Sequence, residues 1–246
     1  QESAWKREHD MSKLLATRAW LRVLLTAGGM IVVAAAGCAG GPPRSGFLAD
    51  YSGFQEAAEH APVWAYVDPD GRTHKLHARI WEDRKNWNAL SKYDRILIDP
   101  VVVHLRPHAK AVWLDPQRLD RLTQYMHDAA VAAVEDGYPV VDEPGENVLR
   151  FRAAITDVRP AIGHVPMDLD RRPARAWANS RPGAAWLEGE AVDSVSGERI
   201  VGLILSARGS YFDAFKEEDR WEHSRRAIDG LASYIREGLD EAHRGD

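Results

Sequence analysis

Two long stretches of the chain place apolar residues at every third or fourth position, the spacing of an amphipathic helix. Residues 115–137 form the first stretch, and its opening aspartate and proline are a typical helix start. Residues 215–244 form the second stretch, which is more highly charged. The two apolar stripes consist of Leu119, Leu122, Met126, Ala129, Ala130 and Ala133, and of Trp221, Ile228, Leu231, Ile235 and Leu239.

Three other stretches have the patterns of strands. Residues 147–158 alternate apolar and polar positions, which predicts a strand with one solvated face. Residues 184–210 indicate a strand, a turn near Gly197 and a second strand. Residues 93–105 are rich in β-branched side chains and almost continuously apolar, which favours a central strand covered on both faces. Pro100 predicts a bulge or an exposed edge within that strand.

The remaining body segments are less regular. Residues 59–92 contain a possible hairpin around Asp70 and Gly71, whereas the proline- and arginine-rich residues 159–183 indicate a long loop. The elements predict an α/β (α+β) fold. We expect a two-layer sandwich, with a mixed sheet of about four or five strands packed by two amphipathic helices, in the order β-α-β-β-β-α.

The N-terminal part has the pattern of an export signal. Lys13, Arg18 and Arg22 precede an apolar run over residues 24–36, which is shorter than the roughly 20 residues that a membrane span needs. Residues 1–10 do not resemble any part of a signal. We therefore expect residues 1–37 to be upstream sequence and signal peptide, removed on export.

The sequence Ala35-Ala36-Gly37-Cys38 resembles a bacterial lipobox, in which small residues precede the cysteine that receives a diacylglycerol group. The resemblance implies cleavage between Gly37 and Cys38 and lipidation of Cys38. The alternatives are a buried core cysteine or a signal cut at Ala34–Ala36. We predict an attachment site and tether over residues 38–58 and a single domain over residues 59–246. Segment 46–54 carries four apolar residues, and we expect it to dock onto the body.

Charge and cysteine content narrow the class of partner. The formal net charge is −5, and removal of five basic and three acidic residues with the leader takes it to −7. Clustered positive charge is needed to bind phosphate backbones, so we expect no nucleic-acid partner. One cysteine excludes an intramolecular disulfide. The oligomeric state stays open.

Three stretches together resemble the bacterial lipoproteins of the DUF3313 family: "GFLADYS" at 46–52, "YDRILIDPVVV" at 93–103 and "EGEAVDSVSGER" at 188–199. The resemblance extends over roughly residues 46–240. It implies a lipoprotein of a Gram-negative bacterium that faces the periplasm, and it implies no catalytic residues. Ala39 after the cysteine, in place of aspartate, implies sorting to the outer membrane.

The candidate binding surface is aromatic. Trp64, Tyr66, Trp81 and Trp87 lie on or beside the expected hairpin, and tryptophan is enriched at interfaces. The alternative is that these rings cap the sheet.

Several carboxylates and histidines are weaker candidates. Glu188 and Glu190 share one face of an expected strand, which could serve acid–base chemistry but more often is a solvated face, with Arg199 opposite. Asp99, Asp157 and Asp193 lie at or near strand ends, where aspartate is common. His74 and His77 are three apart, which does not place both on one strand face, and no Cys or carboxylate cluster accompanies them or His104 and His108. We therefore predict no metal and no cofactor.

The sequence therefore favours an outer-membrane lipoprotein whose non-catalytic periplasmic domain binds a protein or another envelope component. The alternative is a carrier or sensor of a small apolar ligand held between helices and sheet. The third hypothesis is an envelope enzyme that uses Asp99, Asp157 and Glu190, which would have to lie in one cleft.

Overall fold

The computed structural model describes residues 42–57, 64–67, 73–162, 181–209 and 220–245. The chain divides into two units, Gln1–Gly40 and Gly41–Asp246, and the description below concerns the second unit. Its elements are β1 (Gln55–Glu56), β2 (Trp64–Val67), β3 (Thr73–Asp83), η1 (Trp87–Lys92), β4 (Arg95–Ile98), β5 (Val102–Val103), η2 (Ala111–Trp113), α2 (Pro116–Val134), β6 (Val148–Arg159), β7 (Ala184–Asp193), β8 (Arg199–Arg208) and α4 (Glu222–Arg244).

The strands form one mixed sheet, which confirms the α+β class. The strand order is β1-β3-β8-β7-β6-β4, with β2 pairing β3 and β5 pairing β6. Strands β4 and β5 run parallel to β6, and the other pairs are antiparallel. The described residues contain eight strands, five of them before α2. The predicted count of four or five and the order with one strand before the first helix are therefore corrected.

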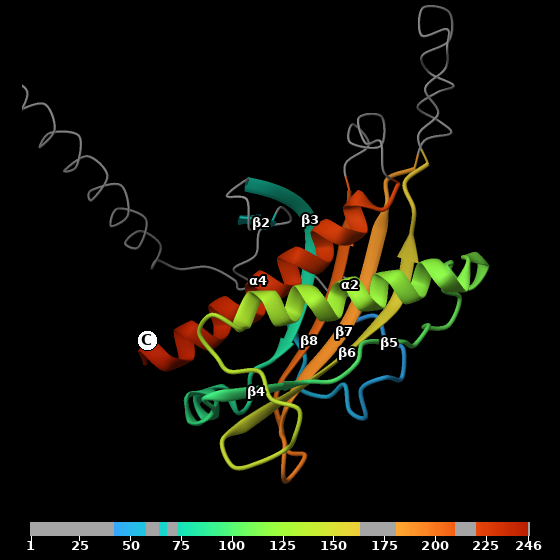
Figure 1. Ribbon diagram of the computed structural model, residues 1–246. Helices are drawn as coiled ribbons and strands as arrows, with labels where there is room; N and C mark the ends of the chain where they lie inside the picture. Colours follow the sequence, from blue (N-terminus) through green and yellow to red (C-terminus); the bar gives the residue numbers. More distant parts are fainter. Residues whose placement is uncertain (1–41, 58–63, 68–72, 163–180, 210–219, 246) are drawn as a thin grey trace, which may run out of the picture. The chain divides into compact units, whose positions relative to one another are not determined.

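Both predicted helices are present, and they lie across the same face of the sheet (Figure 1). The Asp115 side chain caps α2 by accepting a hydrogen bond from the Gln117 N–H, 3.1 Å away. The helices are joined by the Tyr125 hydroxyl, which donates to Asp229 at 2.7 Å. Their apolar stripes pack on the inner face of the sheet in one core with Leu187 and Leu205. None of the helices in the described part of the chain is long and apolar enough to span a bilayer.

The opposite face of the sheet is covered by the N-terminal segment 44–57, which we call the strap. Leu48 of the strap is buried in an apolar cluster with Trp81 of β3 and Ile204 of β8. Phe47, Tyr51 and Phe54 pack against this cluster, so the expected docking of segment 46–54 is confirmed. The prediction of a solvated face on residues 147–158 is wrong for the second half of β6, where Thr156 and Asp157 are fully buried.

The apolar run 93–105 does not form a central strand. It is divided into β4 and β5, which both pair only with β6 in the main ladder and therefore lie at one edge of the sheet. Pro100 lies between the two short strands, and Val102 and Val103 are exposed. The break expected at Pro100 is confirmed, whereas the expected cover on both faces is corrected.

Candidate functional site

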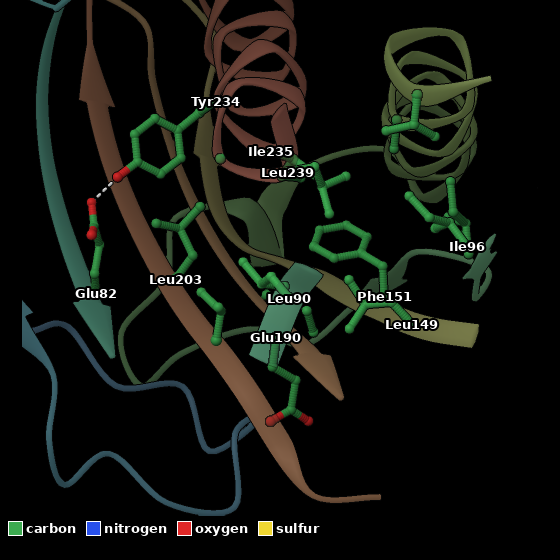
Figure 2. Close-up of a pocket in the computed structure, with 17 residues that line it drawn as sticks. Glu82, Leu90, Ile96, Leu149, Phe151, Glu190, Leu203, Tyr234, Ile235 and Leu239 are labelled. Atoms are coloured by element: carbon green, nitrogen blue, oxygen red, sulfur yellow. Dashed lines mark hydrogen bonds between the residues drawn. The ribbon is translucent and has the colours of Figure 1, made fainter. Parts of the chain in front are cut away.

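An apolar cavity of about 70 Å³ lies between the two helices and the inner face of the sheet (Figure 2). It begins where the ends of α2 and α4 meet strands β4, β6, β7 and β8. Its apolar lining consists of Leu90, Ile96, Ile98, Ala130, Val134, Leu149, Phe151, Ala191, Val201, Leu203, Ile235 and Leu239, with Gly189 and Gly238. The polar residues of its lining are Glu82, Glu190 and Tyr234, and the Glu190 carboxylate points away from the apolar side chains (Figure 2).

Two glycines shape this region. A Cβ atom at Gly189 of β7 would lie 3.3 Å from the Arg152 carbonyl oxygen and 3.4 Å from the Phe151 ring, so the strand is closely packed at this position. A Cβ atom at Gly238 of α4 would lie 2.8 Å from Trp87, closer than carbon atoms normally approach. The absence of a side chain at position 238 therefore lets α4 pack directly on the indole ring.

A polar cluster of three side chains closes one side of the cavity. The Tyr234 hydroxyl donates to Glu82 (Figure 2). It also accepts from the Arg84 guanidinium at 2.9 Å. Arg84 also donates to the buried Glu82 carboxylate. The Arg84 guanidinium stacks 4.1 Å from the centre of the Trp87 ring. Together these groups neutralise Glu82 and hold the Tyr234 ring at the boundary.

Glu82, Tyr234 and Gly238 also line a wider groove of about 940 Å³. The groove lies between the strap, the end of β3 and the C-terminal half of α4. Its charged side chains are Asp50, Glu56, Glu82, Asp83, Arg84, Lys85, Arg199, Glu237 and Glu241. The polar groove and the apolar cavity are therefore neighbours that share one tyrosine–glutamate contact.

The two glutamates of β7 do not lie on a solvated face, which corrects that expectation. Glu188 is 1% exposed and accepts hydrogen bonds from the Ser45 N–H and hydroxyl, both at 2.9 Å, and from the Tyr51 hydroxyl at 2.5 Å. Glu190 is buried beside Arg152, which lies 3.1 Å away. The strap covers Glu188, so neither carboxylate is available as a free acid–base pair. Arg199 instead pairs with Asp83 at 2.7 Å.

The three candidate aspartates have separate partners. Asp99 pairs with Arg150 at 2.8 Å. Asp157, which is completely buried, accepts from Arg106 and from the backbone N–H groups of Lys110 and Ala111. A second guanidinium, that of Arg159, also lies 3.1 Å from the Asp157 carboxylate.

Asp193 has a local structural role in the turn after β7. It accepts from the Ser196 backbone N–H at 2.7 Å, and this contact lowers the pKa of its carboxyl group. It also accepts from the Tyr93 hydroxyl at 3.1 Å. Burial and the neighbouring Asp193 raise the pKa of Tyr93 to about 12. Within the described residues, no three His, Cys, Asp or Glu side chains form a group that could hold a metal ion.

The four aromatic residues predicted as a binding surface have different environments. Trp81 is buried under the strap, with the Arg79 guanidinium 4.8 Å from its ring centre. Trp87 is partly buried against α4. The side chains of Trp64 and Tyr66 lie outside the described part, as do Gly37, Cys38 and most of loop 159–183. The sequence suggested an apolar ligand between helices and sheet, where the cavity lies, but it did not identify the residues that line the cavity or predict the groove.

The geometry defines a class of protein: an α+β domain with a mixed sheet, two helices on one face and an N-terminal strap on the other. The chain belongs to the family described as protein of unknown function (DUF3313), whose model matches residues 73–235. Among the curated proteins, no relative matches.

Two solved structures are similar to the chain, both of PelC dodecamers from Paraburkholderia phytofirmans. One is a single-residue variant of PelC, with 11% identity, a TM-score of 0.34, and coverage of 60% of this chain and 87% of that one. The other has 10% identity, a TM-score of 0.34, and coverage of 58% and 87% respectively.

Proposed function

We propose that this protein is a lipid-anchored protein of the bacterial outer membrane, whose periplasmic domain binds an envelope component without catalysing a reaction. The observation that carries the proposal is the lipobox-like sequence that ends at Cys38. The strap, which packs on the sheet, begins only a few residues later. The strap is fixed to the sheet from Ser45 onward. The strap therefore packs on the sheet within residues 38–58, the range that the sequence assigns to the tether.

The length of this tether sets the distance between body and bilayer. Six residues lie between Cys38 and Ser45, so seven steps of about 3.3–3.6 Å each join them in an extended chain. The lipid on Cys38 would hold the strap within about 25 Å of the membrane surface. Two or more acyl chains on one cysteine anchor a protein stably, whereas one chain does not.

The separation of the three candidate carboxylates supports a binding role without catalysis. Asp99, Asp157 and Glu190 each lie beside an arginine of their own. Each of the three carboxylates is therefore bound to a guanidinium group rather than to another carboxylate. The third hypothesis needed these groups together in one cleft, and their separate partners do not favour it.

Metabolic labelling with palmitate tests the anchor. Cys38→Ala is expected to abolish labelling and to leave the unprocessed precursor, whereas a Ser45→Ala control keeps both labelling and processing. Continued cleavage and membrane sedimentation of Cys38→Ala would contradict the proposal. Ala39→Asp tests the location, because the lipoprotein resemblance implies that this variant moves to the inner-membrane fraction of a density gradient.

The cavity favours a second candidate function, the binding of a small apolar group. An engineered protein cavity of about 150 Å³ takes up benzene or xenon. A cavity of about 70 Å³ has room for a shorter group of a few carbon atoms. The ligand would place this apolar end among Leu203, Ile235 and Leu239 and a polar end beside Glu82 and Tyr234.

Methyl NMR under xenon pressure tests this candidate. Xenon is expected to shift the methyl resonances of Leu203, Ile235 and Leu239, which line the cavity. Leu187 and Leu205 are controls, since they are buried in the same core but do not line the cavity. Equal responses from both sets, or no response, would remove the second candidate.

A further inference from the structure

The edge of the sheet beside β5 carries exposed apolar side chains that neither the proposed anchor nor the cavity explains. Trp113 is 84% exposed, Val102 44% and Val103 36%. These three residues belong to one segment, 100–114, which connects β4 to the start of α2.

Three hydrogen bonds hold this segment against β6. The His104 N–H donates to the Ile155 carbonyl at 3.1 Å, and the Arg106 N–H donates to the Thr156 carbonyl at 2.9 Å. The Ala111 N–H then binds the Asp157 carboxylate at 3.0 Å. Since a strand rises about 3.3 Å per residue, these three anchor points lie within roughly 7 Å along β6. We call Val102, Val103, Lys110 and Trp113 the edge patch.

The charge of the segment differs from that of the rest of the protein. Residues 100–114 contain no aspartate or glutamate, although the chain as a whole contains 37 acidic residues and a net charge of −5. Lys110 is exposed within the patch. Arg106 stacks on Trp186 and neutralises the buried Asp157, so no uncompensated negative charge from that carboxylate lies beneath the patch.

The strap begins beside the same edge. The Phe47 ring lies 6.0 Å from the His104 ring, centre to centre, and Gly46 also approaches His104. Arg44, exposed at the start of the strap, stacks 5.6 Å from the centre of the Tyr51 ring. Only seven residues lie between Cys38 and Gly46, so an anchor at Cys38 would hold this edge within about 30 Å of the bilayer.

We propose that the edge patch is a second membrane contact, which lies against an anionic lipid surface. Tryptophan prefers the boundary between lipid headgroups and acyl chains, and exposed valines add apolar area there. Lysine and arginine near an anionic bilayer each strengthen the contact, by about fivefold for one charge. The proposal rests on the proposed lipid anchor, which brings this edge to the membrane and makes a weak contact sufficient.

Photo-crosslinking in intact cells tests the proposal with the full chain. A benzophenone amino acid is placed at Trp113 or Val103, and at Val195 as a control. Val195 is 72% exposed but lies in the turn between β7 and β8. Cells are grown with radioactive phosphate, which labels phospholipid headgroups but not a diacylglycerol on Cys38.

We expect a radioactive adduct at positions 113 and 103, at least about fivefold above position 195. Lys110→Glu is expected to reduce the adduct at position 103 about fivefold or more, whereas Lys85→Glu, which also reverses an exposed charge, leaves it unchanged. Equal adducts at positions 113 and 195, no lipid adduct at 113, or an adduct with a protein would each overturn the proposal.

A parallel palmitate label separates the two possible failures. If the protein does not incorporate palmitate, the anchor itself is wrong. If it incorporates palmitate but position 113 gives no phospholipid adduct, the anchor stands and the edge patch does not contact the membrane.

Discussion

The hydrogen bonds between the buried Glu188 carboxylate and the strap allow a prediction of how strongly the strap is held to the sheet. We consider Tyr51→Phe, which removes a single hydroxyl group. This hydroxyl donates to Glu188 at 2.5 Å and accepts from the Gly46 N–H at 2.8 Å. The aromatic ring and its contact with the Phe54 ring, 6.2 Å away, are kept.

The expected loss of stability follows from the charge and burial of Glu188, the group that accepts this hydrogen bond. A hydrogen bond to a charged group contributes about 1.5–3 kcal/mol, and the loss lies at the upper end when the partner stays buried. Glu188 is 1% exposed and keeps only the two Ser45 donors in the variant. We therefore expect the free energy of unfolding to fall by about 2–3 kcal/mol. Each kcal/mol lowers Tm by about 2–4 °C in a domain of this size.

Urea unfolding and amide hydrogen exchange measure the effect. The variant should unfold at lower urea concentration, and residues 44–57 should exchange faster while α2 is unchanged. Ser52→Ala is the matched control, because its hydrogen bond to Asp50 lies in the same strap but is exposed. We expect the free energy of unfolding of the Ser52→Ala control to fall by less than about 0.5 kcal/mol. If Tyr51→Phe lowers the free energy of unfolding by no more than this control does, and hydrogen exchange in the strap is unchanged, the reasoning is refuted.

Three further predictions concern packing, charge and pH. Gly202→Ala places a Cβ atom 2.4 Å from the Phe54 ring, so it should cost about 1–3 kcal/mol in urea unfolding, and much less in a Phe54→Ala background. Asp157→Ala leaves two guanidinium groups beside an empty site and should cost about 3–5 kcal/mol, whereas Asp99→Ala, at a half-exposed pair, should cost about 1 kcal/mol or less. Because the folded protein raises the pKa of Tyr93 to about 12, it binds this proton more tightly than the unfolded chain does. Stability should therefore fall as pH rises from 10 to 12, and urea midpoints should show a weaker fall for Tyr93→Phe.

The two helices and the β7–β8 hairpin could be predicted because their sequence signals are local. Asp115 and Pro116 start α2 through contacts with the next few residues, and the stripe on α4 repeats within each two turns. The turn at Gly197 has a positive φ of 73°, which glycine adopts readily. In each case the physical cause lies within a few residues of its effect.

The environment of β7 could not be predicted in this way. Glu188 is buried by Ser45 and Tyr51, which lie 143 and 137 residues earlier in the chain. The boundary of the cavity likewise depends on Tyr234 and Glu82, 152 residues apart. Strands β1 and β5 have two residues each, too few for a hydrophobic period to appear.

The strap also predicts where a soluble form of the domain must begin. A chain that starts at residue 59, the boundary that the sequence indicates, lacks Leu48, which is 2% exposed in the folded protein. It also exposes Trp81 and Ile204 and leaves Glu188 without its three strap hydrogen bonds.

The free energy that the strap contributes decides whether a chain without it can fold. Burial of one large apolar side chain contributes about 1.5–3 kcal/mol, and each hydrogen bond to a charged group about 1.5–3 kcal/mol. Loss of Leu48 together with three such bonds is comparable to the roughly 5–15 kcal/mol that stabilises a whole domain. We therefore expect a chain that begins at residue 42 to unfold cooperatively in urea, and one that begins at residue 59 to be insoluble or to lack a cooperative transition. If both chains have the same urea midpoint, the strap contributes nothing to the fold, and the short tether inferred from Ser45 onward would no longer follow.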